Sequence, residues 1–321
     1  MKKIVLLGLL LMIGYKSFCW GFYGHRKINY LACFLLPPEM LLLYKPSIDF
    51  ISEHAVDPDK RRYAVANEGP RHYIDLDRYG VYPFNDLPRK WNDAIEKYSA
   101  DTIIQHGIAP WWIQIMFARL TEAFQEKDKF KILKLSADIG HYLADIHVPL
   151  HTHSNHNGQF TDQHGIHGFW ESRIPELLAD SKWDFFVGKA DYVSNPLQFA
   201  WTRILESAAA ADSVLKFEKE LGNKFPPDKK YAFENRNGTI VRQYSSEYSI
   251  AYDKLLNNMI ERRMRQSIHA VASFWYSAWV NAGQPDLKEV SGKEFAASDL
   301  KELEELNMQW LIGKAKGKTC D

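Results

Sequence analysis

The sequence predicts an all-α protein built as a single multi-helix domain. Apolar residues recur every three or four positions over several long segments, and alternating strand patterns are scarce. Prolines, such as the pairs Pro37-Pro38 and Pro226-Pro227, interrupt these segments at points where a helix ends or begins. A chain of 321 residues with 46% hydrophobic residues can bury a sizeable core, and this length favours one domain over two.

The chain begins with the pattern of a cleaved export signal. A short basic start precedes an apolar run over residues 4–13, and small residues follow at Ser17 and Cys19. A bilayer core requires about 20 apolar residues, so neither this run nor any later one predicts a transmembrane anchor. We therefore expect a signal peptide at 1–19, one domain at 20–321, and a periplasmic or secreted protein.

Composition excludes some classes of function. Without residues 1–19 the chain keeps 37 basic residues against 40 acidic ones. Such a balance argues against a protein that grips duplex DNA, because that requires clustered Lys and Arg. Cys33 lies in an apolar helical run and Cys320 lies beside the C-terminus, so no disulfide framework is expected. Nothing in the sequence indicates an obligate protein partner.

Helical periodicity is strongest in four segments, at 90–105, 111–124, 129–146 and 241–282. Between the third and fourth lies a segment, 153–167, that is rich in Asn and Gly and poor in apolar residues. This composition predicts an ordered functional loop between two helices.

The densest group of potential metal ligands lies at the end of the 129–146 segment. His141 and Asp145 are four positions apart, so a helix places them on one face, and Asp145 has the reach to bridge two ions. Pro149 ends the helix, which lets His151 return toward the same cluster. A single polar residue here would be a satisfied core group. Three ligand types within eleven positions are costly to bury without a cation, so we predict a metal site.

Other candidate ligands are weaker when taken alone. His167 and Glu171 are again four positions apart, on a helix that we expect to continue through 172–178. Asp57 and His72 lie further upstream. Most such residues are structural or lie on solvated helix faces, so their meaning depends on the rest of the pattern.

The predicted mature start, Trp20-Gly-Phe-Tyr-Gly-His25, completes that pattern. The ordered set resembles the ligand series of the superfamily of bacterial zinc-dependent phospholipases C and fungal single-strand-specific nucleases, and it is highly specific as a motif. The nine positions are Trp20, His25, Asp57, His72, His141, Asp145, His151, His167 and Glu171. The resemblance implies the all-α fold of that superfamily, and residues 172–321 add helices without an identifiable ligand.

The resemblance implies three zinc ions. One would be held by Asp57, His72, His141 and Asp145. Asp145 would bridge to a second, held by His25 and by the amine and carbonyl oxygen of Trp20, while His151, His167 and Glu171 would hold the third. These are ordinary zinc ligands. A hydroxide shared by two zinc ions is a strong nucleophile, which implies phosphoester hydrolysis with Asp57 and Asp145 as the catalytic carboxylates.

Neighbouring residues bear on the substrate. By the same resemblance, Tyr73 would stack on a base, Asp75 would bind its edge, and Lys60 would bind a phosphate, as in the nucleases. Glu171 instead matches the phospholipases, which use Glu where the nucleases use Asp. The choline site of the phospholipases, however, requires an acidic residue three positions after the first Trp, where this chain has Tyr23. We therefore expect a nuclease or nucleotidase that acts on single-stranded nucleic acid or nucleotides.

Two alternatives stay open. The first is a phospholipase C with a phospholipid substrate, and the second is a non-catalytic module with a closed structural zinc site. Aromatic side chains bind unpaired bases at about 1–3 kcal/mol each, although core packing explains most of those in this chain. We expect two of six, near Tyr73, to line a pocket. The six are Phe22, Tyr23, Trp111, Trp112, Phe169 and Trp170.

Overall fold

The structure is a computed structural model that describes residues 21–236 and 238–316. This part of the chain is mostly helical, which confirms the predicted class, and its strands form a two-stranded antiparallel hairpin. The α-helices are α1 (Gly21–Ala32), α2 (Pro38–Tyr44), α3 (Ile48–Glu53), α4 (Asp57–Arg61), α5 (Trp91–Tyr98), α6 (Ala100–Gln105), α7 (Ala109–Glu126), α8 (Lys129–Asp145), α9 (Ile166–Gly168), α10 (Ile174–Lys182), α11 (Pro196–Lys224), α12 (Ser246–Leu255), α13 (Met259–Asn281), α14 (Leu287–Ser291) and α15 (Ala297–Ile312), and the strands are β1 (Tyr231–Arg236) and β2 (Thr239–Tyr244).

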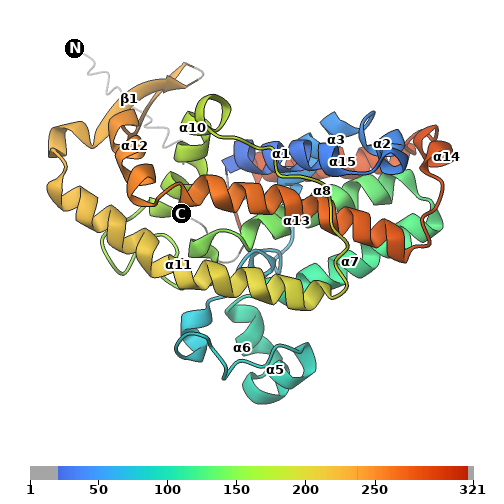
Figure 1. Ribbon diagram of the computed structural model, residues 1–321, viewed down its shortest axis with the longest axis horizontal. Coiled ribbons are helices and arrows are strands. Elements are labelled where there is room, and N and C mark those ends of the chain that lie inside the picture. The colour runs from blue at the N-terminus through green and yellow to red at the C-terminus, as the bar shows by residue number, and fades with distance from the viewer. Residues whose placement is uncertain (1–20, 237, 317–321) are drawn as a thin grey trace, which may run out of the picture.

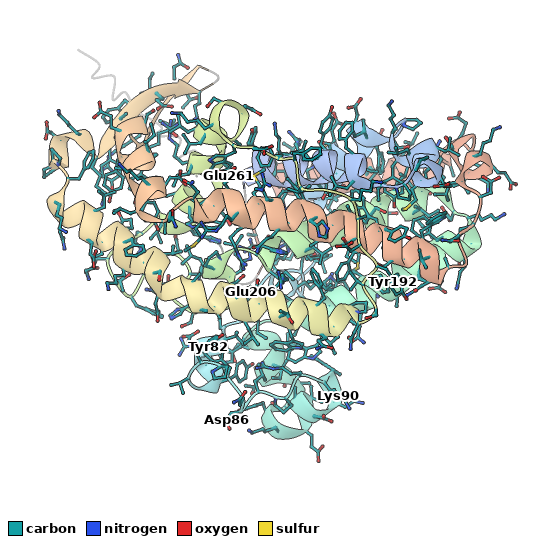
Figure 2. All side chains as sticks on the ribbon, viewed as in Figure 1. Tyr82, Asp86, Lys90, Tyr192, Glu206 and Glu261 are labelled. Atoms are coloured by element: carbon teal, nitrogen blue, oxygen red, sulfur yellow. The ribbon has the colours of Figure 1, made fainter. Side chains whose placement is uncertain are left out.

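Helix α8 lies at the centre of the molecule. It contacts α1, α3, α7 and α13, and Figure 1 shows α11 and α13 running along the long axis with α5 and α6 projecting below. Figure 2 labels Tyr82, Asp86 and Lys90 on that projecting part. From Ser136 to Asp145 every residue of α8 is buried, so this half of the helix has no solvent face. Its polar side chains must therefore find partners inside the protein.

A glycine allows α1 to approach α8 closely. A Cβ atom built on Gly140 would lie 2.1 Å from Oδ1 of Asn29, a residue with 0% exposure. The Asn29 side chain donates to the carbonyl oxygen of Ala137 at 3.1 Å, which ties α1 to α8. His25 precedes Asn29 by about one helical turn, so the same contact brings His25 against α8.

Two predicted helices are divided in the structure. The 90–105 segment forms α5 and α6, separated at Ser99, whose φ is +68° and whose hydroxyl accepts from the Thr102 N–H at the start of α6. The 241–282 segment begins in β2, which pairs with β1, and then forms α12 and α13. Asn257 and Asn258 interrupt those helices with positive φ values of 51° and 55°. The predictions at 111–124 and 129–146 match α7 and α8 to within two residues.

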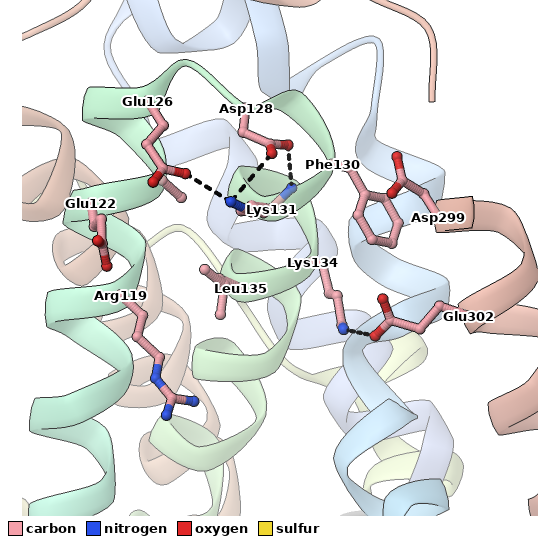
Figure 3. A pocket seen from close by; sticks show the side chains of 11 residues that line it. Arg119, Glu122, Glu126, Asp128, Phe130, Lys131, Lys134, Leu135, Asp299 and Glu302 are labelled. Carbon is pink, nitrogen blue, oxygen red and sulfur yellow. Dashed lines mark hydrogen bonds and ion pairs between the residues drawn. The ribbon is translucent and has the colours of Figure 1, made fainter. Parts of the chain in front are cut away.

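The last helix, α15, is peripheral. None of its residues is buried, and it contacts α8 through an ion pair between Glu302 and Lys134. Figure 3 shows this pair beside a polar cavity of about 460 Å³, where Lys131 also pairs with Glu126 at 2.8 Å. Across residues 21–236 and 238–316, no helix is both long and apolar enough to cross a membrane.

The close approach at Gly140 generates a prediction. Gly140→Ala forces α1 away from α8, so we expect a loss of about 1–3 kcal/mol in unfolding free energy, measured by denaturant melts. The double variant with Asn29→Ala removes the clashing side chain and is expected to recover part of that loss. A Gly140→Ala protein as stable as the parent would show that this contact does not limit the packing of α1.

Candidate metal centre

The buried half of α8 supplies the first two candidate ligands. His141 and Asp145 are both 0% exposed, and His141 Nε2 lies 3.3 Å from Asp145 Oδ2. His141 Nδ1 lies 2.8 Å from the carbonyl oxygen of Ala55. If Nδ1 carries the proton and donates it to that oxygen, the Nε2 lone pair faces Asp145. This Nδ1–H tautomer is the one that a histidine needs to bind a metal through Nε2.

Helix α1 brings His25 to the same place. The His25 and His141 rings stack with centroids 3.7 Å apart, and His25 Nε2 lies 3.5 Å from Asp145 Oδ1. The three side chains form the first of three groups in which the candidate ligand atoms all lie within 4.8 Å of one another.

The second group adds His72 and Asp59 to His141. His72 Nδ1 lies 3.0 Å from His141 Nε2 and 2.9 Å from Asp145 Oδ2. Asp59 Oδ1 lies 3.7 Å from His141 Nε2 and 3.9 Å from His72 Nδ1. Several electron-pair donors thus point at one small volume, as the ligands of a cation do.

The third group consists of His151, His167 and Glu171. Glu171 Oε2 lies 3.0 Å from His167 Nε2 and 3.5 Å from His151 Nε2. Glu171 belongs to a π-helical turn, η6 (Phe169–Arg173), and such turns are frequent at functional sites. The turn η5 (Pro149–Thr152) follows α8, and the His151 Nδ1 lies 2.7 Å from the carbonyl oxygen of His72. This contact links the third group to the second.

Burial without hydrogen-bond partners makes these groups candidates for a cation site. Asp59, His25 and Glu171 are at most 5% exposed, and both polar side-chain atoms of each lack a hydrogen-bond partner among the described residues. A buried polar group without a hydrogen bond lowers the stability of the fold by about 2–7 kcal/mol. A metal ion would satisfy all of these atoms at once.

The charge balance of the groups also suits a cation. Burial lowers the pKa of His25 well below its usual range, so the imidazole is neutral. Burial acts to raise the pKa of Asp145, but His141 and His151 outweigh it and hold that pKa well below its usual range. For His141, burial is outweighed by Asp145 and Asp59, which raise its pKa to about 9. That rise reflects negative charge that a cation would balance.

The structure does not bring Asp57 into any of the three groups. Its oxygens lie 2.6 Å from His54 Nδ1 and 2.9 Å from Lys60 Nζ, and Asp59 takes the place expected for Asp57 beside His72. Residues two positions apart on a helix point about 200° apart, so only one of these acids can face α8. The Asp57-Pro-Asp59 doublet is visible in the sequence, but it does not say which acid turns inward.

The predicted substrate residues separate into two places. Tyr73 and Asp75 line a cavity of about 460 Å³ together with Arg78 and His106, directly after His72 in the chain. Lys60 does not lie there. Its Nζ binds Asp57 and the Asn307 side chain of α15, at 2.9 and 2.8 Å.

The aromatic residues also differ from expectation. None of the six lines the cavity that contains Tyr73. Trp111, Trp112 and Trp170 belong to the buried core, whereas Phe22, Tyr23 and Phe169 line a second cavity of about 840 Å³ beside the β1–β2 hairpin.

Trp20 lies outside the described residues, and the adjoining residue shows where the chain enters the site. A Cβ atom on Gly21 would lie 2.7 Å from Ser172 Oγ, and Ser172 follows Glu171 in η6. The first described residue of α1 therefore packs against the turn that carries a ligand of the third group.

Comparison with known proteins gives no assignment, because no family model and no curated protein matches this chain. The interpretation of the site therefore depends on its ligand pattern and its geometry.

The geometry predicts different metal content for two isosteric variants. Asp59→Asn replaces a carboxylate of the second group with a weaker ligand, so we expect zinc affinity at that group to fall by about 10–100-fold. Asp57→Asn is the matched control. The Asp57 carboxylate contacts His54 and Lys60, so its replacement is expected to leave the second group intact. Zinc per chain, measured by elemental analysis after dialysis, checks this. The opposite ranking of the two variants would restore Asp57 as the ligand.

Proposed function

We propose that this protein is a zinc-dependent phosphoester hydrolase that acts on single-stranded nucleic acid or nucleotides. The observation that carries the proposal is the position of Asp145 between two groups. Its Oδ1 lies 3.5 Å from His25 Nε2, and its Oδ2 lies 2.9 Å from His72 Nδ1. A carboxylate that turns one oxygen toward each of two imidazole groups is suited to bridging two cations.

The donor set fits zinc. Among the described residues, the candidate ligands are imidazole nitrogens and carboxylate oxygens, which zinc accepts in tetrahedral or five-coordinate sites. The first two groups share His141, and the Asp145 carboxylate lies 2.9 Å from His72 of the second group and 3.9 Å from His151 of the third. This arrangement agrees with the three ions that the resemblance implies.

The residues of the chain orient the reaction. Zinc ions, when bound, supply positive charge and a hydroxide nucleophile at neutral pH. The carbonyl oxygens of Ala55 and His72 accept from the Nδ1–H groups of His141 and His151, which directs both Nε2 atoms to the centre. Tyr73 and Asp75, in the cavity beside His72, would hold a nucleobase by stacking and by a hydrogen bond to its edge. Export is part of the proposal, since residues 1–19 have the pattern of a signal peptide.

One observation favours a phospholipase C as the second candidate. The cavity of about 840 Å³ begins at Phe22 and Tyr23, continues along Phe169 near Glu171, and reaches Phe233 and Ile240 of the hairpin. A pocket with this aromatic and aliphatic lining fits the apolar part of a lipid better than a phosphate-linked sugar.

Burial favours the third candidate, a non-catalytic zinc module. The side chains of the three groups are 0–5% exposed, and structural zinc sites are closed whereas catalytic sites keep an open position. Hydrolytic activity separates this candidate from the other two.

The central test is hydrolysis by the mature protein, starting at Trp20 and supplied with Zn²⁺. We expect cleavage of single-stranded DNA, RNA or nucleoside monophosphates to exceed cleavage of phosphatidylcholine vesicles, and EDTA to abolish it while lowering the melting temperature. Preferential release of diacylglycerol would favour the phospholipase. Zinc binding without hydrolysis of any of these substrates would favour the structural module.

A second prediction concerns the chain start. If the amine of Trp20 is a ligand, one extra residue before it turns that amine into an amide, which is a poor zinc ligand. We expect a protein with Ala before Trp20 to lose about one zinc and to lose at least about tenfold in activity, relative to the exact start. The variant Trp20→Ala with the correct start keeps the backbone donors and serves as the control. Equal zinc content for both starts would remove the chain start from the centre.

A further inference from the structure

A buried carboxylate lies behind the candidate ligand His72. Glu68 is 0% exposed and precedes the turn η3 (Gly69–Arg71), and its Oε1 lies 3.8 Å from His72 Nε2. The other ring nitrogen, Nδ1, faces His141 and Asp145. The His72 ring is thus held between the candidate metal group on one side and a carboxylate on the other.

Glu68 is itself held in place from three directions. The Arg71 guanidinium pairs with Glu68 Oε2, and Arg61 Nε lies 3.6 Å from the same oxygen. The Tyr142 hydroxyl donates to Glu68 Oε1. Arg61 also pairs with Asp138 at 2.9 Å, so the carboxylate is the end of a buried network that begins inside α8.

Stability alone does not account for this network. Replacing a buried ion pair with apolar residues of similar volume is often neutral or stabilising, so charges of this kind need another reason to be present. The network converges on His72, since Glu68 is the carboxylate that faces the ring nitrogen opposite the metal group.

We infer that Glu68 is a positioning residue for His72. Its carboxylate lies 3.8 Å from the ring Nε2, so its negative charge favours a proton on that nitrogen. The Nδ1 lone pair then stays directed at the group of Asp59 and His141, and Nδ1 becomes a stronger donor. Glu68 does not touch a substrate or a reacting atom. The inference rests on the proposed metal centre, because it concerns how tightly that centre holds its ion.

The test compares two isosteric variants within the same network. In Glu68→Gln, the two arginines attract the amide oxygen, which leaves the amide N–H₂ opposite the ring N–H, where it cannot accept. Asp138→Asn is the matched control. It weakens the ion pair between Asp138 and Arg61, and Asp138 lies on the far side of the network from His72. Both variants are made in the full mature chain, and zinc affinity is measured by competition with a chromophoric chelator.

We expect Glu68→Gln to weaken one zinc site by about 10–100-fold, while Asp138→Asn lowers the melting temperature of the metal-free protein and leaves zinc affinity within about twofold of the parent. Replacing zinc with Co²⁺ adds a readout that a merely structural role would not move. The visible absorption bands of the cobalt protein are expected to shift in Glu68→Gln and to stay unchanged in Asp138→Asn.

Several outcomes separate the possibilities. Equal zinc affinity and equal cobalt spectra for Glu68→Gln and the parent would overturn the inference and leave the proposed function standing. Equal losses of affinity in both variants would also overturn it, by assigning the network to general stability. A parent protein that binds no zinc would overturn both proposals. If Glu68→Gln does not fold, Glu68→Asp keeps the charge while withdrawing it from the ring, and the same comparison is made with that variant.

Discussion

The Asp145 carboxylate, buried among imidazole rings, is the interaction on which the rest of the centre depends. Its two oxygens lie within 4 Å of nitrogens from His25, His72, His141 and His151, which come from α1, the segment after η3, α8 and η5. A buried negative charge in this position requires compensation, which the surrounding rings provide and the proposed cation would increase. Each element that carries a ring must therefore approach α8 closely, and this requirement explains the tight packing around the second half of that helix.

Small residues and backbone acceptors make that convergence possible. Gly140 lets α1 lie against α8, and Gly21 lets the start of α1 lie against η6. The Nδ1 atoms of His141 and His151 hydrogen-bond to the carbonyl oxygens of Ala55 and His72. The Nε2 atom of each ring is therefore the one that faces the other candidate ligands. His72 has no such backbone partner in the structure, and a side chain, Glu68, faces its outer nitrogen instead. The orientation of the candidate ligands thus depends on Ala55 and Glu68, which are not candidate ligands, and on the backbone of His72.

Much of the centre could be predicted from sequence because its ligands follow local rules. His141 with Asp145, and His167 with Glu171, are four positions apart, and a helix brings such pairs together whatever the rest of the fold does. The choice between Asp57 and Asp59 depends on how α4 rotates against α8, which is a tertiary effect and is not encoded in spacing. Sequence periodicity does not predict the hairpin for a related reason. The apolar residues of 241–282 fit a helix, and only the pairing of β1 with β2 makes the first of them a strand. Asn257 and Asn258 gave no strong signal, because asparagine tolerates both helical and left-handed backbone.

The substrate question has a structural counterpart in the two cavities that flank the ligand groups. The smaller one follows His72 and presents Asp75, Arg78 and His106, which suit the polar edge of a base. The larger one is lined by Phe169 and Gly168, between the ligands His167 and Glu171, and continues between aromatic and aliphatic side chains. The sequence features that favour a nuclease, Tyr73 and Asp75, belong to the first cavity, and Glu171, which favours a phospholipase, stands beside the second. The two sets of features therefore belong to two different cavities. Under the proposed function, the cavity that admits the substrate would decide whether a nucleotide or a phospholipid is hydrolysed.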